Sequence, residues 1–195
     1  MSFINARFLK LILSNNSVEV SVGSDFSKIV KPIALNGEPG VIWMDMSRKY
    51  GRLADGINNK DWRVSGYNPC AEQSLAAYET CCLAEVYLPN IESKEQLLDV
   101  CQLLYRINKH SLALPCHLKE TEDIVHKNMR MGIGVTGVLQ ATEEQRSWLS
   151  DTYRRLREFD FKYSHEHGFP ESIKLTTVKP SGTLSLLPGV TSGCH

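Results

Sequence analysis

The second half of the chain alternates short β-like segments with amphipathic helix-like segments. Residues 83–88, Leu-Ala-Glu-Val-Tyr-Leu, have the composition of a strand, which residues 89–90, Pro-Asn, close. Residues 173–178 form a β-branched strand, and residues 131–137 are a glycine-rich segment between two helical patterns. Strands that alternate with helices are typical of α/β folds. We therefore predict an α/β fold, and we expect the backbone of residues 131–137 to pack closely against a neighbour or a ligand.

Two capping boxes mark the starts of helices in this half. Ser93 with Gln96 opens the first helix, and Thr142 with Gln145 opens the second. Apolar residues then recur at helical spacing, which gives each helix one buried face. The residues predicted to be buried are Leu97, Cys101, Leu104 and Ile107 in the first helix, and Trp148, Leu149, Leu156 and Phe159 in the second.

Turn-forming residues divide the first half of the chain. Residues 36–40, Asn-Gly-Glu-Pro-Gly, are expected to separate the element that holds Ile29 and Val30 from the segment that begins at Val41. Residues 56–59 form a second break. No repeat, low-complexity tract or interdomain linker is visible, so residues 1–195 are predicted to form a single structural unit.

Charge and cysteine usage exclude several classes of protein. Lys plus Arg number 22, as do Asp plus Glu, so neither nucleic acid nor another polyanion is indicated as a partner. Residues 1–17 contain an apolar run broken by Arg7 and Lys10, with no cleavage pattern and no membrane-spanning length. We expect this segment to be part of the fold, and the protein to be cytoplasmic without a membrane partner. Six cysteines in such a chain do not indicate a disulfide scaffold.

The stretch from Asn68 to Cys82, NPCAEQSLAAYETCC, places three cysteines beside two glutamates. A zinc site could use Cys70, Cys81 and Cys82, but the spacing lacks the paired C-x-x-C knuckles of structural zinc sites. Packing could account for Cys82 but leaves Asn68 and Glu72 unexplained. The third interpretation is a redox site, in which one thiol reacts with a substrate and another supplies electrons.

A second stretch with chemical potential begins at Ser181-Gly182-Thr183. A loop that enters a helix here would offer backbone N–H groups and two hydroxyls to a phosphate, and Lys179 could add positive charge. A helix N-cap without a ligand is the alternative, and the three residues alone do not decide between them.

Together these segments resemble the active-site segments of ribonucleotide reductases, and most closely those of the monomeric adenosylcobalamin-dependent ribonucleoside-triphosphate reductases. The motifs that carry the resemblance are residues 68–72, 79–81 and 179–187, with further support from residues 36–40, 48–53 and 132–137 in the same order.

The resemblance implies a fold and a set of residue roles. In this family a ten-stranded α/β barrel encloses a finger loop with a radical cysteine at its tip, and the matching loop is at about residues 66–82. Cys70 matches the radical cysteine, and Glu72 matches the general base for the 3′ hydroxyl. Asn68 would orient the substrate hydroxyls, and Cys81 matches one of the two reducing thiols.

The resemblance also implies a substrate, a cofactor and a reductant. The family reduces the ribose 2′ hydroxyl of ribonucleotides to give deoxyribonucleotides for DNA synthesis, with adenosylcobalamin as the radical source and thioredoxin or a similar dithiol as the reductant. A phosphate loop at about residues 179–187 would hold the substrate's phosphates. The positions that match are Ser181, Gly182, Thr183, Leu184 and Ser185.

The two remaining questions about the thiols concern Cys82 and the partner of Cys81. Cys82 is expected to be a packing residue, because adjacent cysteines bridge only with strained geometry and neighbouring strand residues point to opposite faces. No cysteine precedes Cys70, so no residue matches the second reducing thiol of the family.

Family members are several times longer than this chain. We therefore expect a fragment or one piece of a split reductase, inactive without a complementary chain. Two alternatives stay open: a non-catalytic remnant that binds a nucleotide or a partner chain, and a small metal-binding protein. The metal alternative would use the cysteines with Cys116-His117 and Cys194-His195, but their spacing is unlike that of zinc sites and no metal ligand is assigned.

Overall fold

The computed structural model describes residues 17–52 and 55–193, and these divide into two compact units, Met1–Ser74 and Leu75–His195. The prediction for residues 1–17 lies almost wholly outside the described residues. The prediction that residues 1–195 form a single structural unit stays a prediction.

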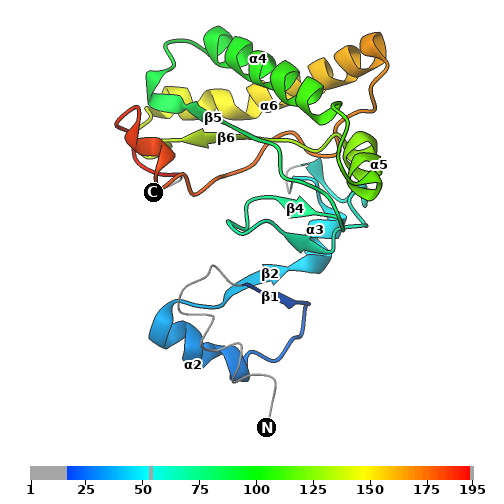
Figure 1. Cartoon of the computed structure of the whole chain (residues 1–195). Coiled ribbons are helices and arrows are strands. Elements are labelled where there is room, and N and C mark those ends of the chain that lie inside the picture. Colours follow the sequence, from blue (N-terminus) through cyan, green and yellow to red (C-terminus); the bar gives the residue numbers. More distant parts are fainter. Residues whose placement is uncertain (1–16, 53–54, 194–195) are drawn as a thin grey trace. The chain divides into compact units, whose positions relative to one another are not determined.

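The first unit contains a β-α-β arrangement. Strand β1 (Ser17–Val20) pairs in parallel with β2 (Gly40–Trp43), with Ser17 opposite Gly40, and helix α2 (Ser27–Asn36) connects them (Figure 1). The predicted break at residues 36–40 is confirmed, because α2 ends at Asn36 and Gly37 adopts a left-handed conformation with φ of 71°. Helix α3 (Met44–Lys49) and strand β3 (Gly66–Tyr67) follow. Strand β4 (Ser74–Leu75) pairs with β3 and crosses the boundary between the units.

The second unit is built on a parallel strand pair. Strand β5 (Leu83–Tyr87) pairs in parallel with β6 (Gly132–Thr136), with Leu83 opposite Gly132. Residues 174–177 extend this sheet, since the N–H of Ile133 donates to the carbonyl of Leu175 at 2.8 Å. The remaining elements are η2 (Leu88–Asn90), α4 (Lys94–Leu112), α5 (Lys119–Asn128), α6 (Glu143–His167) and η3 (Leu184–Leu186).

Both predicted strands are found, but the second is less regular than predicted. The strand expected at residues 83–88 is β5. The one expected at residues 173–178 is an extended segment whose regular pairing with β6 is a single parallel bridge between Ile133 and Thr176. It lies at the edge of the sheet among the described residues, where a strand gains ladder hydrogen bonds on one side only.

The core of the second unit lies between the sheet and the two long helices, which run together over one face of β5 and β6 (Figure 1). Val86 of β5 and Ile133 of β6 belong to this core, so their side chains lie on the face of the sheet that the helices cover. Because side chains alternate along a strand, the residues next to them point to the opposite face. Helix α4 contributes Leu97, Cys101 and Tyr105, and the predicted core position of Cys101 is confirmed at 6% exposure. The predicted face of α6 is also confirmed: Leu156 is buried, with Trp148, Leu149 and Phe159 packed against the core.

One predicted core residue of α4 is wrong. Ile107 is 54% exposed, and the buried positions beyond Cys101 are Tyr105, Asn108, Lys109 and Leu112. At 3.6 residues per turn, steps of three from Cys101 to Leu104 and again to Ile107 rotate away from the core, whereas a step of four returns to it.

Both predicted helix starts are confirmed. The hydroxyl of Thr142 accepts from the N–H of Gln145 at 3.1 Å and the Gln145 side chain accepts from the N–H of Thr142, which completes a capping box. Ser93 likewise accepts from the N–H of Gln96 at 3.1 Å. These bonds satisfy N–H groups that have no partner within the helix.

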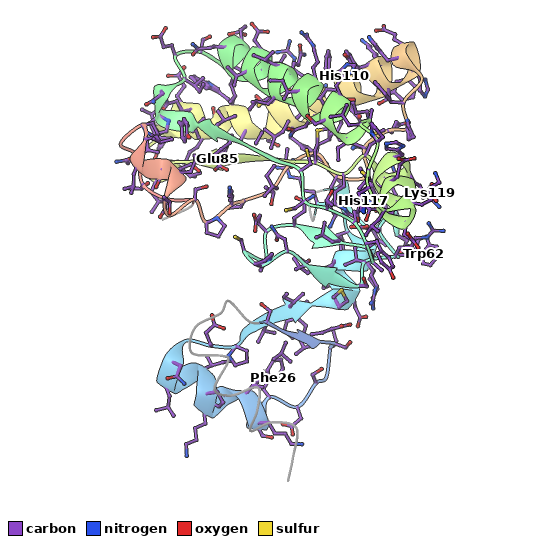
Figure 2. The ribbon with its side chains drawn as sticks, viewed as in Figure 1. Phe26, Trp62, Glu85, His110, His117 and Lys119 are labelled. Carbon is purple, nitrogen blue, oxygen red and sulfur yellow. The ribbon has the colours of Figure 1, made fainter. Side chains whose placement is uncertain are left out.

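The glycine-rich segment packs closely against a side chain, as predicted. A Cβ atom built on Gly134 would lie 2.9 Å from Oε2 of Glu85, the β5 residue labelled in Figure 2. Oε1 of the same carboxylate accepts a hydrogen bond from Thr136. The absence of a side chain at Gly134 thus leaves room for Glu85 on the sheet face that α4 and α6 do not cover.

A buried charged network joins α4 to α6. The Lys109 ammonium lies 3.2 Å from Asp160 Oδ1, and both side chains are fully buried. Tyr105 donates to the same oxygen at 2.7 Å, and the Ser172 N–H donates to Oδ2 at 3.0 Å. Figure 2 labels His110, which follows Lys109 and forms a 2.8 Å hydrogen bond with the Tyr163 hydroxyl of α6.

Within the described part of the chain, no helix is both long and apolar enough to cross a membrane.

Candidate active site

Asn68, Cys70 and Glu72 lie in one tightly closed loop between β3 and β4. The Asn68 N–H donates to the carbonyl of Gln73 at 3.0 Å, and Asn68 Oδ1 accepts from the Gln73 N–H at 3.0 Å. Ala71 has a φ of 60°, and its N–H donates to the Asn68 carbonyl at 2.9 Å. These bonds hold the loop with the Cys70 thiol exposed and the Glu72 carboxylate buried.

The loop geometry narrows what Asn68 can do. Its side-chain oxygen already accepts a backbone hydrogen bond, so the amide N–H₂ is the part suited to a substrate hydroxyl. Asn68 also lines a cavity of about 260 Å³ within the first unit. That volume lies below the range of about 300–1,000 Å³ typical of complete small-molecule sites, so it can hold part of a nucleotide. The other lining residues include Glu19, Ile42, Met44 and Tyr67.

Cys81 and Cys82 have different environments. Cys81 is exposed, whereas Cys82 is partly buried and packs against the core of the second unit, as predicted. Burial, with a smaller contribution from the neighbouring Cys81, raises the pKa of the Cys82 thiol to about 11. Because the thiolate is the reactive form, Cys82 is a poor nucleophile at neutral pH. Cys70 belongs to the first unit and Cys81 to the second.

The predicted phosphate loop enters a single 3₁₀ turn, η3, and not the helix that the sequence suggested. Gly189 adopts a φ of 70° directly after Pro188, and its N–H donates to the carbonyl of Leu186 at 3.3 Å, which ends the turn. Ser181 and Ser185 are buried, while Gly182 and Thr183 are exposed and Leu184 is intermediate.

Ser181 has the most unusual setting in this loop. Its φ is 51°, its exposure is 4%, and its hydroxyl has no hydrogen-bond partner among the described residues. A buried hydroxyl without a partner is costly, so a ligand oxygen at this position would be favourable. The backbone at Gly193 packs closely against the residue at which the loop begins. A Cβ atom built on Gly193 would lie 2.7 Å from the carbonyl oxygen of Lys179. These features suit an anion but do not depend on a helix terminus.

A buried ion pair involves a residue close to Cys81 in the sequence. No sequence pattern predicted the buried ion pair between Arg130 and Glu79, which is two residues before Cys81 along the chain. Its partners lie far apart in sequence, and no periodicity links them.

In residues 17–52 and 55–193, no group of three or more His, Cys, Asp or Glu side chains is arranged to hold a metal ion. Cys194 and His195 lie outside those ranges.

Comparison with known proteins identifies the family. The family described as "Ribonucleotide reductase, barrel domain" matches residues 12–183 of this chain. The chain belongs to the ribonucleotide reductase family. This membership supports an α/β barrel-type fold, of which the described strands and helices form part.

The ribonucleotide reductases most similar in sequence include two eukaryotic proteins. One from Dictyostelium discoideum, named "Probable adenosylcobalamin-dependent ribonucleoside-triphosphate reductase", is 38% identical over 93% of this chain and 25% of its own length. One from Euglena gracilis, named "Adenosylcobalamin-dependent ribonucleoside-triphosphate reductase", is 37% identical over 93% of this chain and 26% of its own length.

A solved structure agrees with the sequence comparison. The crystal structure of a B-12 dependent (class II) ribonucleotide reductase superposes with a TM-score of 0.83 at 34% identity, and the match covers 93% of this chain and 30% of that one. The chain therefore spans between a quarter and a third of the length of the reductases it matches.

Proposed function

We propose that this chain is part of the catalytic barrel of an adenosylcobalamin-dependent ribonucleoside-triphosphate reductase. The observation that carries the proposal is the closed loop of residues 68–73, which holds an exposed thiol, a buried carboxylate and an oriented amide together. Its relatives are named for this activity. The reaction replaces the ribose 2′ hydroxyl by hydrogen and gives a deoxyribonucleotide.

In this mechanism the Cys70 thiyl radical takes the 3′ hydrogen of the ribose. Glu72 accepts the proton of the 3′ hydroxyl, which requires an ionised carboxylate within hydrogen-bond reach. The N–H₂ group of Asn68 donates to a substrate hydroxyl and orients the sugar. The 2′ oxygen leaves as water after protonation. The hydrogen atom on Cys70 then returns to C3′, which regenerates the Cys70 thiyl radical.

The two electrons of the reduction come from a pair of thiols. Cys81 and a second thiol lose two electrons and two protons and form a disulfide, which balances the loss of the hydroxyl as water. The exposure of Cys81 suits this exchange, whereas Cys82 is held in the core with a raised pKa. Thioredoxin or a similar dithiol then reduces the disulfide, and the second thiol comes from a part of the enzyme that this chain does not contain.

The substrate's phosphates bind at the loop of residues 181–185. The unpartnered hydroxyl of Ser181 donates to a phosphate oxygen, and the exposed backbone at Gly182 and Thr183 allows close approach. The preference for triphosphates rests on the names of the relatives.

One feature of the loop at residues 68–73 suits the cofactor. When bound, adenosylcobalamin supplies the radical that removes hydrogen from a thiol, and the exposed thiol of Cys70 is open to that exchange. We assign no contact with the cofactor to any described residue.

Catalysis needs the remainder of the barrel. We propose that the two units complete a ten-stranded α/β barrel together with the larger part of the enzyme, in the cytoplasm, with residues 66–82 as its finger loop. Edge strands such as β2 and β5 would then gain partners, and their apolar surfaces would be covered.

A reconstitution assay tests this function. The purified chain is mixed with ribonucleoside triphosphates, adenosylcobalamin and dithiothreitol, alone and with a chain that supplies the rest of a relative's length. We expect turnover only in the mixture, loss of turnover in Cys70→Ser, and wild-type turnover in Cys116→Ser, whose thiol lies outside both loops. Turnover by Cys70→Ser in the mixture would remove Cys70 from the radical role. Nucleotide binding without turnover in every mixture would favour the non-catalytic alternative.

A further inference from the structure

Glu79 is a buried carboxylate in an otherwise exposed segment. Its neighbours Tyr78, Thr80 and Cys81 are all exposed, whereas the Glu79 side chain is 1% exposed. A buried charge is costly unless it is paired and hydrogen-bonded. Oε1 of Glu79 lies 3.0 Å from Nε of Arg130, whose side chain is also 1% exposed.

Two hydrogen bonds complete the environment of this carboxylate. Asn128 donates from Nδ2 to Oε1 at 2.8 Å, and the N–H of Ala76 donates to Oε2 at 2.8 Å. The second bond closes a turn in which Tyr78 adopts a φ of 63° and the Glu79 N–H donates to the Ala76 carbonyl at 3.2 Å. Glu79 therefore shapes its own turn and joins it to the last residue of α5 and to Arg130, which precedes β6.

The residues to which Glu79 is joined are themselves held to the sheet. Asn128 is the last residue of α5, and its carbonyl accepts from the Ile173 N–H at 2.9 Å. The Met131 N–H donates to the Lys174 carbonyl at 3.0 Å. Arg130, between these two bonds, is thus attached to the extended segment beside β6, which makes it a rigid partner for Glu79.

Cys81 lies between two attachments to this same support. On one side, Glu79 is held by Asn128 and Arg130. On the other, the Cys82 carbonyl accepts from the Gly132 N–H at 2.9 Å. The Cys82 sulfur points to the core, 4.0 Å from the Asn108 carbonyl oxygen. Only Thr80 and Cys81 separate the two attachments, which limits the directions open to the Cys81 side chain. Cys81 is exposed, whereas Cys82 packs against the core.

We propose that Glu79, Arg130 and Asn128 form a clamp that positions the Cys81 thiol and keeps it turned away from Cys82. The proposal rests on the role of Cys81 as a reducing thiol, because such a thiol must stay free for its partner and not form a bridge with its neighbour. Buried ion pairs contribute little net stability compared with apolar residues, which favours a positioning role for this one. Displacement of a reacting group by about 1 Å costs up to about 100-fold in rate.

The first test removes the clamp and measures the thiols of the chain itself. Glu79→Met with Arg130→Met neutralises both charges together, so neither is left buried and unpaired. Diamide takes two electrons and two protons from two thiols and gives a hydrazine and a disulfide. Peptide mass mapping then gives the rate of Cys81–Cys82 disulfide formation, and alkylation with iodoacetamide gives the rate at Cys81 relative to Cys116.

The matched control is a second buried ion pair in the same unit. Lys109→Met with Asp160→Met neutralises two side chains that are also fully buried, but it does not touch residues 76–82. We expect the clamp variant to form the Cys81–Cys82 disulfide at least about 10-fold faster than the wild type, and the control to stay within about twofold of it. Equal rates in the clamp variant and the wild type, or equal increases in both double variants, would overturn the proposal.

A milder variant covers the case in which the clamp variant does not fold. Asn128→Ala removes one hydrogen bond and retains the ion pair with Arg130. It is expected to raise the rate of disulfide formation about threefold, with circular dichroism unchanged. A wild-type rate in Asn128→Ala would overturn the proposal where the clamp variant is unfolded.

These readouts need no turnover, so they separate the clamp from the proposed function. If Cys81→Ser keeps reductase activity in the reconstituted mixture, Cys81 is not the reductant, and the disulfide rates still report whether the clamp exists. If the rates are unchanged while Cys81→Ser is inactive, the proposed function stands and the clamp fails.

Discussion

Replacement of Lys109 by methionine is expected to be the most destabilising single change in the helical layer. The Lys109 ammonium contacts Asp160 at 3.2 Å, the Ser172 hydroxyl at 3.0 Å and the Pro170 carbonyl at 2.6 Å, in a site with no solvent exposure. Burial lowers the pKa of Lys109, and Asp160 acts in the opposite direction. Lys109→Met would leave the Asp160 carboxylate buried without its closest cation.

The magnitude follows from the contacts that remain. Breaking a buried pair by removing one partner costs about 3–5 kcal/mol. Asp160 keeps the hydroxyl of Tyr105 and the N–H of Ser172, and Arg157 lies 3.5 Å away with its side chain 25% exposed. This partial compensation places the expected loss near the lower end of the range, at about 3 kcal/mol. At a urea dependence of about 2 kcal/mol per molar, the unfolding midpoint falls by about 1.5 M.

Tryptophan fluorescence can follow the second unit alone. In a Trp43→Phe, Trp62→Phe background, Trp148 of α6 is the remaining tryptophan, and it packs against the core. Urea unfolding is compared for Lys109→Met and for the control Lys119→Met, whose side chain is 73% exposed. The control should change the free energy of unfolding by less than about 0.5 kcal/mol. A loss below about 1 kcal/mol in Lys109→Met, or equal losses in both variants, would refute the reasoning.

Three further predictions concern the same unit. Thr142→Ala removes the helix cap and should cost about 1 kcal/mol in urea unfolding, whereas Thr121→Ala within α5 should cost clearly less; equal costs would contradict the capping role. Gly134→Ala should cost about 1 kcal/mol, the low end of the overpacking range, because its Cβ would lie 2.9 Å from Oε2 at the movable end of Glu85; a double-mutant cycle with Glu85→Ala should recover most of it, and additive effects would exclude that contact as the cause. Burial raises the pKa of Cys101 to about 11 from its ordinary 9.0, so the folded state holds this proton more tightly than the unfolded state. Stability should therefore fall as pH rises from about 9 to about 11, and less steeply in Cys101→Ala; equal slopes would exclude this thiol as a contributor.

Local sequence signals predicted most of the elements of the second unit. Capping residues and helical spacing located α4 and α6, and a run of β-favouring residues located β5. These signals depend on nearby residues, which is why they succeeded. The error at Ile107 arose because two successive steps of three residues, from Cys101 to Leu104 and on to Ile107, rotate away from the buried face of a helix.

The motifs placed Asn68, Cys70 and Glu72 together, and the loop hydrogen bonds agree with that placement. They could not show that Asn68 Oδ1 is already engaged, or that the phosphate loop enters a 3₁₀ turn. Both depend on which backbone groups remain free after the chain has folded.

By itself, the sequence determined the family, the α/β character, and the contrast between Cys81 and a core-packed Cys82. Covalent spacing and alternation along a strand are enough for these conclusions. Only the tertiary structure decided that Glu79 meets Arg130 and that Lys109 meets Asp160, since each pair joins residues about 50 positions apart. The sequence shows no periodic signal for such a pair, because only folding brings the two charges together. Once both charges are buried, their pairing is needed to offset the cost of burial.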